Sequence, residues 1–71
     1  MNTENAFMEM RGDREILIDG CSMLLEYNEE AVVLLLGKQK LKICGEKLCM
    51  DLLNESRMAV SGKIDSVEFL R

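Results

Sequence analysis

Hydrophobic and polar residues alternate with a period of two over most of the chain after residue 13. Ile16 and Ile18 alternate with charged neighbours, and Leu41 and Ile43 alternate with lysines. This spacing is typical of β-strands with one buried face and one exposed face. It predicts an all-β fold in which the alternating apolar side chains share one core, namely Met23, Leu25, Leu41, Ile43, Leu48, Met50, Met58 and Val60.

Glycine and polar clusters interrupt the alternation at short intervals, at Gly20 and at residues 28–30, 37–38, 45–46, 54–56 and 62–63. Turn residues so closely spaced predict about seven short antiparallel strands in one small domain over residues 14–71, arranged as a meander or sandwich. We expect positive φ in at least two of Gly20, Gly37, Gly45 and Gly62. Ile64 and Val67 cannot share a face of a flat strand, which predicts a bulge near Asp65-Ser66.

A shift of 25 residues superimposes the pattern on itself. The shift places Ile16 on Leu41, Gly20 on Gly45, and Gly37-Lys38 on Gly62-Lys63. It predicts a two-fold internal quasi-repeat, in which two like three-stranded units stack and residues 63–70 begin a third.

Residues 31–36, "AVVLLL", do not alternate, which predicts a strand covered on both faces. In so small a domain, one face belongs to the core and the other needs a cover. The two faces are Val32, Leu34 and Leu36 on one side, and Val33 and Leu35 on the other. We expect self-association through residues 32–36, or else a cover formed by the N-terminal segment around Phe7 and Met10.

Residues 1–13 are polar with scattered apolar positions, and Thr3 is suited to cap one helical turn. We therefore expect an N-terminal tail, either flexible or a short helix, ahead of the β domain.

The charge balance is acidic, with 13 carboxylates, nine basic residues and a net charge of -4. Nucleic-acid-binding domains show a basic stripe instead, and anionic lipid surfaces attract basic segments. The apolar run at residues 31–36 is far shorter than the ~20 residues of a membrane span. The N-terminus lacks the basic and apolar regions of a signal peptide, so we expect a cytoplasmic protein.

The residues with chemical potential are three cysteines and a group of lysines. Cys21, Cys44 and Cys49 form an odd set without a C-x-x-C clip, and the chain contains no histidine. A structural zinc site needs four ligands, and a thioredoxin-like site needs a C-x-x-C clip. We therefore predict no catalytic, cofactor or metal site and treat the cysteines as small buried hydrophobes. The alternative is a small ligand-binding or metal- or redox-sensing domain that uses these three cysteines.

Lys38, Lys40 and Lys42 share one parity and line one strand face. Such a stripe either binds an acidic partner or keeps a sheet edge from pairing wrongly, and we expect the second role.

Three stretches carry a family resemblance: "LLEYNEE" at residues 24–30, the pattern L-x-I-x-G-E-x-L at 41–48, and "SGKIDSVEF" at 61–69. Over residues 16–69 the chain resembles the YabP/YqfC family of sporulation proteins, and its YqfC branch in particular. The resemblance implies a small β-rich protein of the mother cell that works with a membrane-protein partner in forming the spore envelope or cortex. The family has no established catalytic residues, so the expected function is that of a non-enzymatic interaction or assembly module.

Overall fold

The computed structural model of the protein describes residues 7–55 and 57–70, which form one open antiparallel sheet without helices. The order across the sheet is β1-β2-β6-β5-β4-β3. The strands are β1 (Phe7–Arg11), β2 (Glu15–Asp19), β3 (Cys21–Tyr27), β4 (Ala31–Leu36), β5 (Gln39–Leu52) and β6 (Arg57–Leu70). The all-β prediction is confirmed, with six strands rather than about seven.

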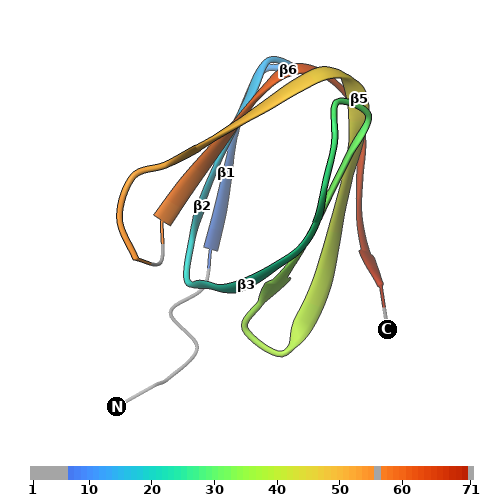
Figure 1. Ribbon diagram of the computed structural model, residues 1–71. Helices are drawn as coiled ribbons and strands as arrows, with labels where there is room; N and C mark the ends of the chain where they lie inside the picture. The colour runs from blue at the N-terminus through green and yellow to red at the C-terminus, as the bar shows by residue number, and fades with distance from the viewer. Residues whose placement is uncertain (1–6, 56, 71) are drawn as a thin grey trace.

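β5 and β6 are long strands that bend in the middle, and Figure 1 shows both bends at the top of the view. The first part of β5 pairs with β4, and the first part of β6 pairs with β2. The sheet therefore curls into two halves, β1 and β2 belonging to one and β3 and β4 to the other.

The bends lie at two glycines where the sequence predicted turns, Gly45 in β5 and Gly62 in β6. A Cβ on Gly45 would overlap the carbonyl oxygen of Lys63, and Gly62 has a φ of +127°. Glycine lets the two backbones approach closely while both strands continue through the bend. This explains the lower strand count. Gly20, Gly37 and Gly62 all have positive φ, as predicted.

The two stacked units expected from the 25-residue repeat do not form. The strands of the two segments pair with one another inside a single sheet, with Ile16 opposite Val60 and Leu34 opposite Leu41. Pairing across the segments allows β5 and β6 to continue through both halves of the sheet.

Residues 7–11 form strand β1, where we expected a flexible tail or a short helix. The strand pairs with β2, and Met8, which lies opposite Ile18, packs against the core. Alternation of Met8 and Met10 with charged residues explains the strand. β1 lies at the opposite end of the sheet order from β3, so this segment is not the cover expected for β4. Thr3 falls outside the described residues.

The core lies between the two halves of the sheet. Its buried cluster is Ile16, Ile18, Val32, Leu34, Leu36, Leu41, Ile43, Leu48, Met58, Val60 and Ile64. Five of the expected core residues belong to this cluster, and Met50 packs against it. The bulge predicted at the end of the chain is also present, because Gly45 pairs with Ile64 while Cys44 pairs with Ser66, leaving Asp65 as the extra residue.

Met23 and Leu25 were expected in the core but are exposed. The register between β3 and β4 shifts twice, and it places Leu24 and Tyr27 opposite the core residues Leu34 and Val32. Residues opposite one another in an antiparallel pair lie on the same face of the sheet. The register shifts therefore place Leu24 and Tyr27 on the core side of β3 and Met23, which lies opposite Leu35, on the outer side.

Candidate interaction surface

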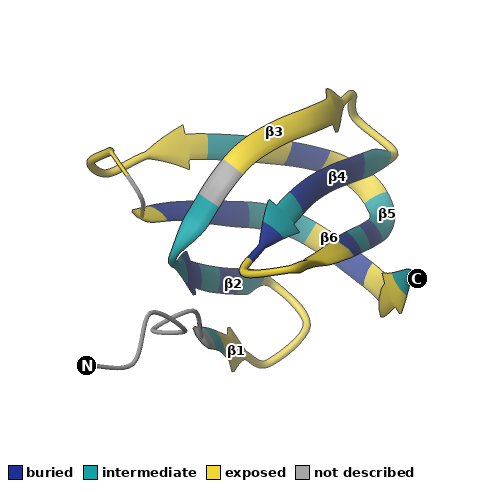
Figure 2. Cartoon of the chain, turned by 90° about the horizontal axis from the view of Figure 1, so that it is seen from below, coloured by how far each residue is buried: buried dark blue, intermediate teal, exposed yellow. Residues whose placement is uncertain are grey.

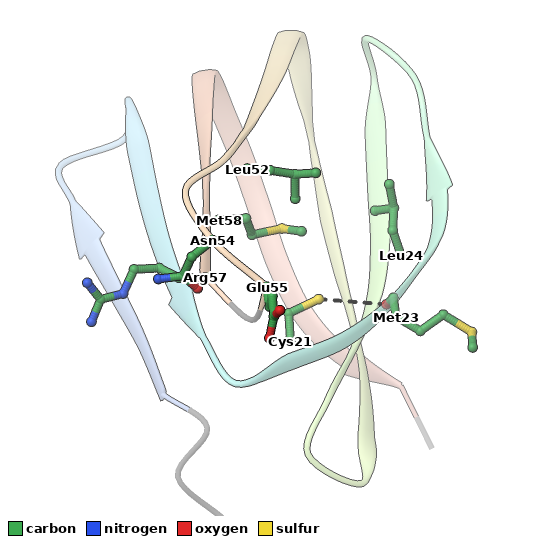
Figure 3. Close-up of a pocket in the computed structure, with 8 residues that line it drawn as sticks. All are labelled: Cys21, Met23, Leu24, Leu52, Asn54, Glu55, Arg57 and Met58. Carbon is green, nitrogen blue, oxygen red and sulfur yellow. Dashed lines mark hydrogen bonds between the residues drawn. The ribbon is translucent and has the colours of Figure 1, made fainter.

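An opening separates β3 from the hairpin that joins β5 to β6. It contains a cavity of about 130 Å³, lined by Cys21, Met23, Leu24, Leu52, Asn54, Glu55, Arg57 and Met58. Figure 3 shows Leu24 on one side of this opening and Leu52 and Met58 on the other, with Cys21 lower in the view. The lining is mainly apolar, and its polar members come from the hairpin and the start of β6.

The opening is bordered by the outer edge of β3 on one side and by the second part of β5 on the other. β3 is the last strand in the sheet order and pairs with β4. On the other side, the N–H of Leu48 donates to the carbonyl oxygen of Glu29 at 2.8 Å, and the N–H of Met50 donates to the hydroxyl of Tyr27 at 3.2 Å. These two bonds join β5 to the end of β3 and to the turn after it, while the cavity lies nearer the start of β3.

Large apolar side chains are exposed along this edge. Met23 is 55% exposed and Leu52 is 70% exposed, and Leu24, Leu25 and Tyr27 are also exposed. In Figure 2, β3 is exposed over most of its described length, whereas its neighbour β4 is mostly buried. Contiguous exposed apolar residues beside a strand edge are typical of a surface that binds another chain.

The segments that border the opening also carry the net negative charge of the protein. Residues 21–30, 48–55 and 57–58 contain five of the 13 carboxylates and one of the nine basic residues, Arg57. Eight carboxylates and eight basic residues remain in the rest of the chain. The Arg57 guanidinium is already paired, because its Nη2 lies 3.0 Å from Oδ2 of Asp19. The segments around the apolar opening are therefore net negative, and Glu55 lines the cavity itself.

The three cysteines differ in their surroundings. Cys21 lines the opening, packs against the core, and donates from its Sγ to the carbonyl oxygen of Met23 at 3.8 Å. Burial raises the pKa of the Cys21 thiol. Cys44 is half-buried and Cys49 is exposed, so the expectation of a small buried hydrophobe is wrong for Cys49. Among the described residues, no three histidine, cysteine, aspartate or glutamate side chains gather as a metal-binding group.

The lysine stripe does not lie on a sheet edge. Lys40 and Lys42 belong to β5, which pairs with β4 on one side and with β6 on the other, and Lys38 lies in the turn before it. The edge-protecting role is therefore wrong for Lys40 and Lys42, because β5 is an inner strand over this part. The alternative role, binding of an acidic partner, stays a hypothesis.

Residues 32–36 divide between two faces of β4 as the sequence indicated. Val32, Leu34 and Leu36 lie in the core. Val33 is 9% exposed and Leu35 is half-buried, and the register places Lys42 beside Val33 and Lys40 beside Leu35. The long aliphatic parts of lysine side chains are suited to cover neighbouring apolar surface on an outer face.

A comparison with protein-family models gives a match to the YabP family over residues 2–71. The chain belongs to the YabP family. The match covers nearly all of the chain and does not separate the branches of the family, so membership of the YqfC branch stays a prediction. The YabP family is not known as an enzyme family.

No curated protein and no solved structure matches the chain. Across the residues that the structure describes, no helix is long and apolar enough to cross a membrane.

Sequence reasoning did not find the opening between β3 and the hairpin. Two local signals point to the edge strand: "CSMLLEY" has no lysine, and Leu24-Leu25 interrupts its alternation. Both fit an edge strand without the usual protection against pairing. The other wall comes from residues 52–58, and local patterns do not show which strands meet across the fold.

Proposed function

We propose that this YabP family member is a non-enzymatic interaction module in endospore formation, and that it binds a membrane-protein partner during assembly of the spore envelope or cortex. The single observation that carries the proposal is the end strand β3 with its exposed apolar side chains beside the opening. A free strand edge next to an apolar surface binds other chains by strand addition. Family membership is compatible with a sporulation-related role.

We also propose where the protein acts and that it acts by binding alone. The protein acts in the mother cell, on the cytoplasmic side of the membrane that surrounds the forespore. It does so by binding its partner, without a catalytic step, cofactor or metal ion. Loss of the protein should therefore reduce the yield of heat-resistant spores, and restoring the wild-type chain should recover it.

Photo-crosslinking in sporulating cells tests this function. A photoreactive amino acid replaces Met23 on β3 in one strain and Met10 on β1 in a matched control strain, since both side chains are exposed on end strands. We expect a crosslinked adduct with an integral membrane protein from position 23 and none from position 10. Equal adducts from both positions, or none from either, would contradict the proposal.

Self-association through the outer face of residues 32–36 is a further part of the proposal. The support is the outer face of β4, where Leu35 is half-buried and shares its face with the buried Val33. Replacing both with threonine should dissociate an oligomer without unfolding the monomer, as measured by light scattering and circular dichroism over a range of concentrations. Unfolding at every concentration would show that both faces of β4 stabilise the monomer.

A further inference from the structure

We propose that the opening beside β3 binds an extended strand of a partner in which apolar residues alternate with lysine or arginine. This inference deepens the proposed function and rests on it, because it specifies the chemistry of the partner segment. The partner strand pairs with the outer edge of β3, and its apolar side chains enter the opening.

The backbone of β3 determines the shape of the partner segment. β3 is seven residues long and is the end strand of the sheet, so its outer edge presents backbone groups directed away from β4. Strand addition satisfies such groups with the main chain of an extended peptide, while alternate side chains of that peptide point to opposite faces. The partner is therefore an extended segment with a period of two.

The inner side of the opening selects apolar side chains. Leu24 and Leu52 stand on either side of the cavity, and Met58, which is buried in the core, forms part of its lining. The cavity of about 130 Å³ is large enough for aliphatic side chains and too small for a helix about 10 Å wide. Every second residue of the partner strand is therefore apolar.

The outer side and the rim select positive charge. Glu26 lies on the outer face of β3 opposite Val33, and Glu55 lines the cavity at the hairpin. Glu29, Glu30 and Asp51 add three carboxylates on the bordering segments, whereas Arg57 is paired with Asp19. Lysine or arginine residues between the apolar residues of the partner would complement the charge of these carboxylates. Cytoplasmic segments next to membrane helices are rich in these residues, which fits a membrane-protein partner.

A second copy of this chain fits the opening poorly. Pairing two β3 strands would bring the two sets of five flanking carboxylates towards each other, with one arginine on each side. Like charges across an interface oppose association. The end strand β1 offers no better complement, because its charged residues, Glu9 and Arg11, are of opposite sign and already form an ion pair.

The binding test uses a fluorescein-labelled peptide of seven residues, the length of β3, in which lysine and valine alternate. One control peptide has the same composition with its valines consecutive, and a second alternates glutamate and valine. Fluorescence anisotropy with the wild-type chain should show saturable binding of the alternating lysine peptide that weakens as salt is added. The two control peptides should bind more weakly.

Charge reversal at the opening gives the matched variant pair. The double variant Glu26→Lys with Glu55→Lys should bind the lysine peptide about tenfold or more weakly, because two attractions become repulsions. It should bind the glutamate peptide more tightly. Asp65→Lys with Glu68→Lys makes the same change in net charge at exposed positions of β6, away from the opening, and should have a much smaller effect. All four positions are exposed, so circular dichroism should show the wild-type fold in both variants.

Three results would overturn the inference: no binding of the lysine peptide at millimolar concentration, equal effects of the two double variants, or a dimer formed without peptide in which the β3 amides are protected from hydrogen exchange. The last would identify a second copy as the occupant. If the peptide fails while crosslinking from position 23 still identifies a membrane protein, the chemistry assigned to the partner is wrong and the proposed function stands. If the peptide binds as expected and no crosslink forms in cells, the proposed function fails instead.

Discussion

Replacing Gly62 with alanine tests the bend that joins the two halves of the sheet. Gly62 has a φ of +127°, and a Cβ there would lie 2.6 Å from the carbonyl oxygen of Lys47 and 3.1 Å from that of Glu46. The backbone conformation alone costs an L-residue about 1–3 kcal/mol, and forcing atoms into a filled space typically costs another 1–3 kcal/mol or so. A domain of this size has a free energy of unfolding of only ~3–5 kcal/mol. The combined cost of about 2–6 kcal/mol should therefore leave the variant marginally stable or unfolded at 25 °C.

Gly12 provides the matched control for this substitution. Its φ is +63°, and a Cβ added there meets no atom within 4 Å. The cost should be limited to the left-handed conformation, about 1–2 kcal/mol. With an m value of ~1 kcal/mol/M in urea, the unfolding midpoint falls by about 1–2 M for Gly12→Ala, and by about 2 M up to complete loss of the folded state for Gly62→Ala. Equal midpoints for the two variants, measured by far-ultraviolet circular dichroism, would refute the role assigned to the bend.

The exposed Cys49 thiol should react with a thiol reagent first and Cys21 last, because burial raises the pKa of Cys21 and leaves less thiolate at neutral pH; a faster Cys21 in peptide-resolved alkylation would contradict this. Leu34→Ala should remove about 2–5 kcal/mol of stability, because Leu34 is fully buried, and a urea midpoint like that of the wild type would show that the core differs. Tyr27→Phe should speed hydrogen exchange at the Met50 amide, which loses its partner across the opening, and an unchanged rate would mean that this bond does not form in solution.

The alternation of apolar residues was enough to predict the fold class and most of the core, because a period of two depends only on local backbone geometry. Leu41, Ile43 and Val60 are in the core for this reason. The same pattern misplaced Met23 and Leu25, since the register shifts between β3 and β4 change which residues of β3 face inward. Register depends on both strands of a pair, so it is not visible in one of them.

The bends and the opening depend on contacts between distant segments. Gly45 and Gly62 resemble turn residues in the sequence, and their role is decided by the close approach of β5 to β6. The opening brings Leu24 towards Leu52, although neither position is distinctive alone. A local pattern predicts which residues prefer to be buried, while the order of strands decides which edge stays open.

Nuclear magnetic resonance mapping of peptide binding tests the central claim most directly, namely that β3 and the opening beside it form the binding surface. The isotopically labelled chain is titrated with the peptide of alternating lysine and valine, and the backbone amide shifts are followed. We predict that the shifts change along β3 and residues 48–55, and that β1 and the second half of β6 stay unchanged. Changes centred on β1, or on the outer face of β4 and β5 around Leu35 and Lys40, would contradict the account.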